Sequence, residues 1–208
     1  MGPGRVEHPV DEAGSLMVVR LGGTTLVHGP PSSVEAARGH DDAALAELDL
    51  LDRLAPQDRE RRPLGAALLG YADEPVDPPG LDDADVGDEP GLLARLREAA
   101  PPGDVEESGV LELEHRFVLV EDDVPVAASA YSPWSGLLAH VGVLTPPQGR
   151  RTGRGLLVGA AATNDALASG LVPQWRVRPE NAASVALGRR LGYVALGTQT
   201  TVRLGAPT

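Results

Sequence analysis

The chain has 208 residues, of which 42% are hydrophobic, so it is long enough for one full domain or for a domain with a smaller lobe. A formal net charge of −12 argues against non-specific binding to nucleic acid, which needs a basic surface. No cysteine is present, which excludes disulfides, thiolate catalysis and cysteine-based metal sites. The five histidines are scattered without metal-ligand spacing, so we expect no metal centre.

Neither a targeting segment nor a membrane span is expected. Residues 1–10 lack the apolar core of a signal peptide, and no apolar run approaches the ~20 residues that cross a bilayer. We therefore predict a soluble, cytoplasmic protein that does not bind membranes. The acidic balance slightly favours cationic substrates through long-range steering.

The first part of the chain begins with a predicted hairpin. Residues 16–20 and 24–28 have strand composition, and Gly22-Gly23 between them suits a tight turn. After Gly29-Pro30-Pro31, either Ser32 or Ser33 is expected to cap a helix that starts at Val34.

Three further segments lead to a predicted domain boundary. Residues 41–54 have the apolar spacing of a helix, and residues 64–71 form a short apolar run that fits a strand or a buried helical turn. Residues 73–90 are dominated by Asp, Pro and Gly, which indicates an exposed connector; an acidic substrate-recruiting loop is the alternative. We divide the chain into an N-terminal accessory lobe, residues 1–90, and a second domain, residues 91–208.

The second domain alternates strands and helices. A helix over 91–99 is followed by strands at 116–120, 124–131 and 137–144, which we expect to pair as an antiparallel meander. A loop rich in Gly and Arg then leads into a helix that ends at Gly170. The remaining elements are expected to be a strand over 174–178, a helix from Asn181 to Leu191, and strand structure over 193–204. The fold class is therefore α/β, with a mixed and largely antiparallel sheet flanked by helices and a smaller N-terminal α/β lobe.

The loop before the long helix has the composition of an anion site. The first N–H groups of a helix have no internal partner, and the helix dipole adds partial positive charge there. Glycines allow a ligand to approach the backbone, and Arg150, Arg151 and Arg154 add formal charge for a diphosphate.

Two nucleotide-binding motifs fit this loop poorly. A P-loop needs a Lys, and the chain has none. A dinucleotide site is closer, because Gly153, Gly155 and Gly159 resemble a relaxed fingerprint. That fingerprint, however, directly follows a strand in a parallel βαβ unit, whereas residues 145–152 intervene here.

This segment instead resembles the GNAT N-acetyltransferase superfamily. The signature of that superfamily is Gln/Arg-x-x-Gly-x-Gly/Ala between its fourth strand and the next helix. Residues 148–153, Gln-Gly-Arg-Arg-Thr-Gly, fit it except at Arg151, where the family usually has Gly. A shifted register, from Arg150 through Gly153 to Gly155, also fits but aligns the downstream helix less well.

A second block strengthens the resemblance. Residues 175–184 and then Leu187 and residues 190–193 match the family ending of strand, Asn-x-x-Ser, helix and Leu-Gly-aromatic. The phrase at 170–175 is similar to one bacterial branch of the family. The resemblance covers roughly residues 91–204, and residues 1–90 match only as the accessory lobe that some members carry.

The resemblance implies acetyl-CoA as co-substrate. The pantetheine arm would pair with the backbone of the fourth strand, one N–H of which would serve as oxyanion donor, and Asn181 would reach the CoA side of the cleft. The implied cofactor-binding residues are Val143, Leu144, Thr145, Gln148, Gly149, Arg150, Arg151, Thr152, Gly153, Arg154, Gly155 and Asn181. Gly142 in the same strand fits either a close approach of another backbone or a weak point of the strand.

The catalytic groups are less well defined. The family's usual proton donor to the leaving thiolate is a Tyr directly after the Leu187 position, and this chain has Gly188 there, which suggested to us a wider acceptor pocket. His140 is the first candidate for the base, since its imidazole titrates in the useful range; Glu112 and Glu114 are alternatives. Tyr131 and Trp134 are candidates to line the acceptor site or simply to pack.

The predicted function is transfer of an acetyl group from acetyl-CoA to an amine. The alternative is a non-catalytic module that binds acyl-CoA and regulates a partner. The acceptor is a small molecule or a peptide, and the resemblance also suggests a homodimer, since dimers are common among the proteins that this chain resembles.

Overall fold

The computed structural model describes residues 4–206. The chain forms two compact units, which are considered separately. The first comprises residues 1–69, 177–181 and 195–208, and the second comprises residues 70–176 and 182–194. The chain therefore leaves the first unit near the end of one strand and returns to it for the last strand.

The first unit is built on a mixed sheet with the strand order β1-β3-β2-β12-β4. β1 is parallel to β3, whereas β2 is antiparallel to both β3 and β12. The strands are β1 (Gly4–Pro9), β2 (Ser15–Leu21), β3 (Thr24–Gly29), β4 (Arg61–Tyr71) and β12 (Val194–Leu204). The helices are α1 (Pro31–Ala37), α2 (Asp42–Leu45) and α3 (Leu48–Leu54).

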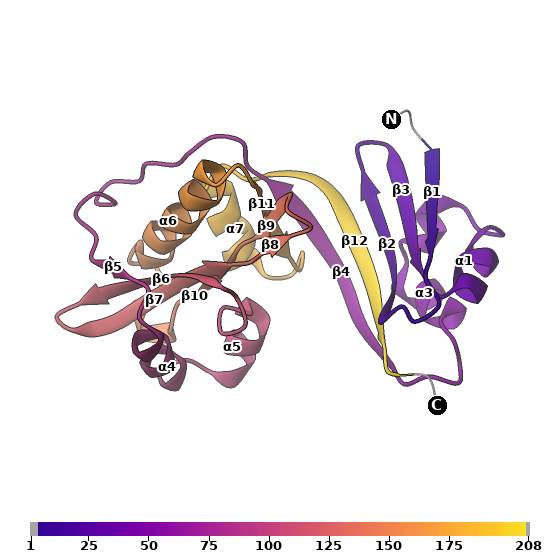
Figure 1. Cartoon of the computed structure of the whole chain (residues 1–208), viewed down its shortest axis with the longest axis horizontal. Coiled ribbons are helices and arrows are strands. Elements are labelled where there is room, and N and C mark those ends of the chain that lie inside the picture. The colour runs from indigo at the N-terminus through magenta and orange to yellow at the C-terminus, as the bar shows by residue number, and fades with distance from the viewer. Residues whose placement is uncertain (1–3, 207–208) are drawn as a thin grey trace. The chain divides into compact units, whose positions relative to one another are not determined.

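The predicted hairpin and strand of this unit are present. Gly22 and Gly23 have φ values of 56° and 82°, the left-handed conformation that a tight hairpin turn requires. Residues 64–71 lie within the strand β4. One face of the sheet contributes alternate buried residues to a core that the three helices complete, and Figure 1 shows α1 and α3 on that face.

Two helix predictions for this unit need correction. α1 begins at Pro31 with Pro30 before it, and no side chain caps it, because proline already has the φ of the first helical turn. The predicted helix over 41–54 is broken into α2 and α3 at Ala46 and Glu47. The Asp41 carboxylate accepts a hydrogen bond from the Ala44 N–H (2.8 Å) and so defines the first of these two starts.

The second unit contains an antiparallel sheet with the order β10-β7-β6-β5. Its strands are β5 (Val86–Gly87), β6 (His115–Glu121), β7 (Val124–Tyr131) and β10 (Gly142–Leu144). The helices α4 (Pro90–Glu98) and α5 (Pro102–Ser108) cover one face of this sheet, and α6 (Arg154–Ala168) covers the other, as Figure 1 shows. The predicted meander is therefore confirmed for its first two strands and for residues 142–144 of the third, with Asp122 and Asp123 at its first turn.

The same unit holds a group of strands with partly parallel pairing. β9 (Leu138–His140) is parallel to β11 (Val172–Val177) and antiparallel to β8 (Pro133–Trp134). α7 (Ala182–Arg190) follows in the chain, and Gly192 after it has φ 79°. The segment predicted as one strand, residues 137–144, is thus two short strands with different partners, divided at Val141.

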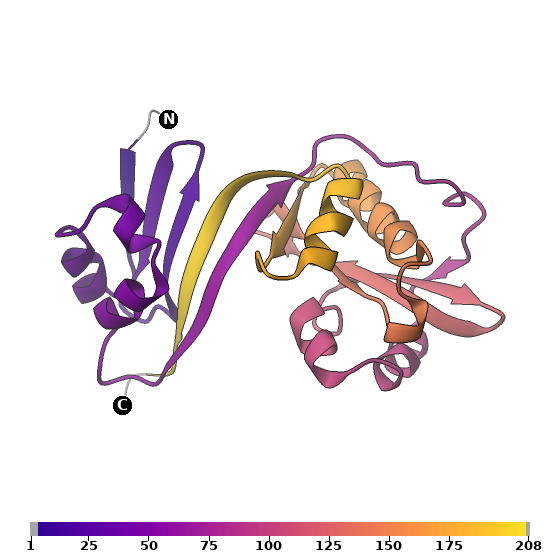
Figure 2. The ribbon, with the colours of Figure 1, turned by 180° about the vertical axis from the view of Figure 1, so that it is seen from behind.

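The acidic connector is an exposed loop for most of its length, as predicted. It passes around the α6 side of the unit, which Figure 2 shows from behind, and ends in the short strand β5. The Asn164 side chain on α6 clamps it by accepting from the Val76 N–H and donating to the Val76 carbonyl, both at 2.8 Å. Its exposed acids include Asp82 and Asp83.

The helix α5 was not predicted from the sequence. A signal for it was present, because Pro102 lies at the first helical position and Gly109, with φ 65°, follows its end. This helix lies against β10. Across residues 4–206, none of the helices combines the length and the apolar character needed to span a bilayer.

Candidate active site

The N-terminus of α6 presents a set of unpaired backbone donors. β10 is followed by a 3-10 turn at Pro147–Gly149, and Gly153, with φ 90°, leads into the helix. The first N–H groups with an acceptor are those of Leu156 and Leu157, which both bond the Gly153 carbonyl. Among the described residues, the N–H groups of 152–155 have no backbone acceptor, as expected for a helix start that binds an anion.

Close packing holds this loop in place. A methyl group on Gly149 would lie 3.2 Å from the Val126 carbonyl oxygen, and one on Gly155 would lie 3.0 Å from Thr145 Oγ1. The Thr152 hydroxyl donates to the Gly149 carbonyl at 2.6 Å. Side chains larger than glycine at 149 or 155 would therefore push the start of α6 away from β10.

Two arginines of this region are already paired with carboxylates from other elements. Arg150 Nη2 lies 2.5 Å from an Asp104 oxygen on α5, and its Nε donates to the Thr145 carbonyl at 3.1 Å. Arg154 makes a bidentate contact with Glu121 at the end of β6, at 2.9 and 2.5 Å. The hydrogen bonds from Arg154 lower the pKa of the Glu121 carboxyl group.

Arg151 differs from both of these arginines. Among residues 4–206 its side chain has no ion pair or hydrogen bond, and it is exposed. Its φ of 63° is the left-handed conformation that usually favours glycine, which agrees with the glycine that the GNAT signature has at this position. An exposed, unpaired guanidinium here is free to contact an anion at the helix start.

β10 has an unpaired edge beside this loop. β9 pairs with β11 up to Val141, whose N–H donates to the Gln174 carbonyl at 3.0 Å, and β10 then pairs only with β7 on its other side. Because peptide groups alternate along a strand, those of Val143 point to the edge that β11 has left. This is the backbone that the sequence assigned to the pantetheine arm, together with Leu144, which is buried, and Thr145.

Gly142 is needed for a close approach. A methyl group there would lie 2.1 Å from the Ser108 carbonyl oxygen at the end of α5. Of the two interpretations that the sequence left open for Gly142, the structure therefore supports the close approach of another backbone. The Gly142 carbonyl accepts a hydrogen bond from the Ser129 hydroxyl at 2.8 Å. α5 is thereby held directly on the strand that carries the predicted reaction centre.

His140, the candidate base, is partly buried at the end of β9, two residues before Gly142. It pairs in register with Gln174 of β11, and among the described residues its buried Nδ1 has no hydrogen-bond partner. Burial, with a smaller contribution from nearby Arg176, lowers the pKa of His140 to about 4. The imidazole is therefore neutral at pH 7 and has an acceptor atom available.

The position of the missing tyrosine is filled by another ring. Gly188 faces the indole of Trp175, and a methyl group on Gly188 would lie 3.0–3.2 Å from three of the indole atoms. Trp175 Nε1 donates to the Ser184 hydroxyl at 3.2 Å. The expectation of a wider pocket at Gly188 is wrong, because Trp175 of β11 occupies the space that a larger residue on α7 would need.

The remaining candidates lie in different places. Tyr131 is fully buried on the α6 face, where it bonds Asp165 at 2.5 Å, and burial together with Asp165 raises its pKa to about 12. Trp134 on β8 is 64% exposed, and Glu114 is exposed near the start of β6. Asn181 directly precedes α7, and Gln148 lies in the 3-10 turn.

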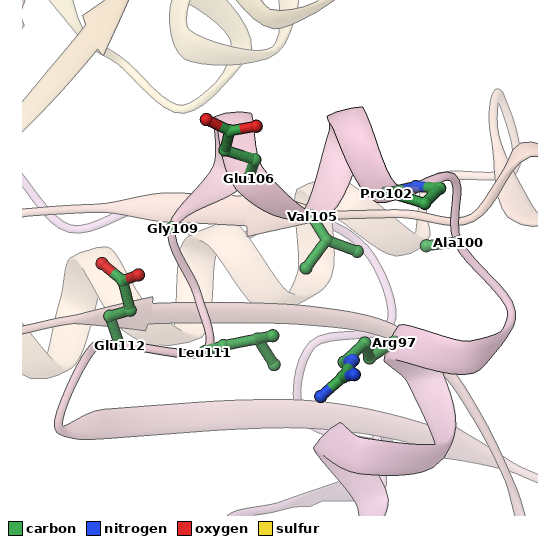
Figure 3. Close-up of a pocket in the computed structure, with 8 residues that line it drawn as sticks. All are labelled: Arg97, Ala100, Pro102, Val105, Glu106, Gly109, Leu111 and Glu112. Atoms are coloured by element: carbon green, nitrogen blue, oxygen red, sulfur yellow. The ribbon is translucent and has the colours of Figure 1, made fainter.

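A pocket of about 330 Å³ lies between α4 and α5, on the face of the sheet that carries Gly142 (Figure 3). Its lining includes Glu112, one of the alternative bases named from the sequence. The sequence did not point to the pocket, because α5, which forms one wall, was not predicted.

Solved structures place this architecture among known folds. A protein described as a GNAT-family acetyltransferase from Novosphingobium aromaticivorans matches over 97% of this chain and 78% of its own, with a TM-score of 0.54 and 21% identity. A GCN5-related N-acetyltransferase from Kribbella flavida covers 71% of this chain and 60% of its own (TM-score 0.50, 23% identity). A GNAT-family acetyltransferase from Colwellia psychrerythraea covers 77% and 62% (TM-score 0.50, 16% identity).

These likenesses establish the fold: the chain has the fold of the GNAT acetyltransferase superfamily, and the resemblance seen in its sequence is confirmed at that level. The predicted mixed α/β class is confirmed as well. The matched part spans less than two thirds of the Kribbella and Colwellia proteins. No protein-family model matches the sequence, and no curated protein matches it.

Proposed function

We propose that this chain transfers the acetyl group of acetyl-CoA to an amine acceptor, and that the second compact unit carries the site. The observation that carries the proposal is the start of α6, where the N–H groups of 152–155 have no backbone acceptor beside an edge strand. Such a helix start binds a diphosphate, and an unpaired strand edge binds an extended amide chain. CoA contains both of these groups in sequence.

The chemistry would follow from that placement. The diphosphate would lie on the helix start with Arg150, Arg151 and Arg154 around it, and the pantetheine arm would pair with the open edge at Val143. The amine nitrogen attacks the thioester carbon, the C–N bond forms, the C–S bond breaks, and the thiolate leaves. The amine loses one proton to a base, and a backbone N–H of β10 stabilises the developing oxyanion.

His140 is the proposed base. Its neutral imidazole has a buried, unpartnered Nδ1 and lies two residues before Gly142 in the chain. A pKa of about 4 makes it a weak base, so its main contribution would be to accept a hydrogen bond from the attacking amine. Glu112, on the pocket wall, is the alternative proton acceptor.

One observation favours a second function, a module that binds acyl-CoA without turnover. Trp175 fills the space at Gly188, where the family's proton donor is expected, and the glycine itself brings no hydroxyl to that position. The thiol of a cysteine side chain has a pKa of about 8.5, however, so a thiolate is a tolerable leaving group near neutral pH even without an acid. Turnover therefore decides between the two functions.

The test measures binding and turnover separately. Acetyl-CoA is expected to raise the thermal unfolding temperature of the chain, whereas NAD at the same concentration is not. Arg151→Gln should reduce this protection, and Arg20→Gln, an exposed arginine of the first unit, should not. Release of free CoA thiol with a panel of amines then identifies catalysis; protection without thiol release would establish the binding module instead.

A further inference from the structure

The pocket between α4 and α5 has apolar walls and charged ends. Ala100, Val105 and Leu111 line it, and their side chains form a surface that a short hydrocarbon segment would cover. Figure 3 shows Arg97 apart from the carboxylates of Glu106 and Glu112, with Val105 and Leu111 between them. At about 330 Å³ the pocket is at the small end of the range for ligand sites.

Arg97 and Glu112 are exposed residues that line one pocket without pairing. Among the described residues neither side chain has a hydrogen bond or ion pair. Several arginines of the second unit do have partners, since Arg150 bonds Asp104, Arg154 bonds Glu121, and Arg95 bonds the Asp123 carbonyl, whereas Arg97, like Arg151, has none among the described residues. Two opposite charges held apart across an apolar surface match a ligand that carries both charges at its own ends.

The acidic end of the pocket is tied to the strand of the predicted reaction centre. The Glu112 N–H donates to the Gly109 carbonyl at 3.1 Å. Gly109 follows Ser108, whose carbonyl oxygen touches Gly142 of β10. An ammonium group bound at the Glu112 end would therefore be the one that lies toward β10, and the Arg97 end would hold the opposite end of the same molecule.

We propose that this pocket binds the acceptor, and that the acceptor is an amine whose ammonium group is separated from a carboxylate by a short apolar body, such as an ω-amino carboxylate or a dipeptide. The inference rests on the proposed acyl transfer and names its substrate class. Glu112 would bind the ammonium group and, as the alternative proton acceptor to His140, would take its proton, leaving the neutral amine to attack the thioester. Arg97 would hold the carboxylate, and Val105 and Leu111 would contact the apolar body.

The proposal is tested with amines that differ in one end only. The probes are 6-aminohexanoate, its amide 6-aminohexanamide, and hexylamine, with Ala-Leu as a dipeptide. Calorimetry measures their binding to the whole chain without acyl-CoA, and release of free CoA thiol from acetyl-CoA measures their turnover. We expect 6-aminohexanoate to bind and react about tenfold better than its amide, since only the carboxylate forms a charge-assisted contact with Arg97.

Two variants assign that preference to the pocket. Arg97→Gln should raise the KM for 6-aminohexanoate to that for the amide while the amide's KM hardly changes. Arg95→Gln, on the same helix but outside the pocket lining, should keep the preference. Glu112→Gln should weaken the binding of all four amines, whereas Glu98→Gln should not. Thermal protection by acetyl-CoA should be the same in all four variants.

The outcomes separate this inference from the proposed function. Equal binding and equal turnover of 6-aminohexanoate and its amide by the unmodified chain would overturn the zwitterionic substrate class, even where acetyl-CoA binds and thiol is released. A preference that survives Arg97→Gln would also overturn it. Binding of 6-aminohexanoate that depends on Arg97, without any thiol release, would support the ligand class of the pocket and overturn the proposed transfer.

Discussion

At the scale of single residues, two arginines of the candidate anion site are already paired with carboxylates of the chain. Arg150 and Arg154 each contact a carboxylate, from α5 and β6 respectively, so a diphosphate would compete with Asp104 and Glu121 for these guanidinium groups. Arg151 has no such competitor among the described residues. Because exposed ion pairs contribute only about 0.2–1 kcal/mol each, a diphosphate with several donors can displace them.

Removing one competing carboxylate should tighten acyl-CoA binding. Asp104→Asn is expected to lower the dissociation constant for CoA by about two- to fivefold at low salt, because Arg150 is then available and one repulsive charge is gone. Isothermal calorimetry measures the change. Asp11→Asn, which removes the same charge from an exposed turn of the first unit, is the control. Weaker CoA binding by Asp104→Asn would show that the ion pair is needed to form the site.

The lowered pKa of His140 predicts that the folded chain loses stability in mild acid. Its pKa is about 4 in the folded chain and near 6.5 when unfolded, so the unfolded chain binds more protons between these values. Stability should therefore be fully present above pH 6.5 and fall by up to about 3 kcal/mol as the pH drops toward 4. Arg176 is the charged neighbour that acts in the same direction as burial.

The comparison of His140→Asn with the unmodified chain isolates this effect. Carboxyl groups with lowered pKa values, such as those of Glu121 and Asp42, lose their contribution to stability at lower pH. The pKa of His28 is also lowered, but this residue is present in both proteins. Urea unfolding at pH 7 and pH 5 should show a smaller difference for His140→Asn. The same difference in both proteins would mean that His140 is already protonated or solvated in the folded chain.

At the scale of elements, α5 and α7 decide the shape of the site by how closely they approach strands. α5 ends on Gly142 of β10, and α7 presents Gly188 to the Trp175 ring of β11. Each contact requires a glycine, which has no side chain. Because a glycine contributes nothing to the hydrophobic pattern of a sequence, that pattern does not reveal where such a contact forms. From the sequence, a close approach of another backbone was one of two interpretations of Gly142, whereas the wider pocket expected at Gly188 was wrong.

Adding one methyl group at the first of these contacts should be costly. Gly142→Ala places a Cβ 2.1 Å from the Ser108 carbonyl oxygen, so α5 or β10 must move, with an expected loss of about 2–3 kcal/mol. Gly91→Ala on α4 meets no atom within 4 Å and should instead stabilise the chain by about 0.5–1 kcal/mol. Thermal and urea unfolding measure both. An unchanged stability of Gly142→Ala would show that α5 is only loosely held on β10.

At the scale of the whole chain, the boundary at residue 90 stays a prediction, while the compact units divide at other places. β12, near the end of the chain, pairs with β2 of the first unit over seven residues, from Gly197 opposite Leu21 to Arg203 opposite Ser15. Residues 1–90 therefore lack a central strand of their own sheet, and residues 91–208 carry that strand without its partners.

Cutting the connector should therefore not separate the chain into two pieces. Cleavage at a protease site introduced between Asp82 and Asp83, both exposed, should give two fragments that co-elute on gel filtration, because β12 remains paired with β2. Addition of urea should release both together. Fragments that elute separately without denaturant would show that the 1–90 lobe folds by itself.

The sequence by itself determined the features that depend on local patterns. The Gly22-Gly23 hairpin, the meander through Asp122 and Asp123, the glycine-led start of α6 and the GNAT resemblance were all visible, because turn residues, alternation and helix starts act over a few positions. Only the tertiary structure decided the pairing of Arg150 with Asp104, the filling of the Gly188 position by Trp175, and the pocket between Arg97 and Glu112. These features join residues 13 to 46 positions apart, and whether such residues meet depends on packing that no local pattern encodes.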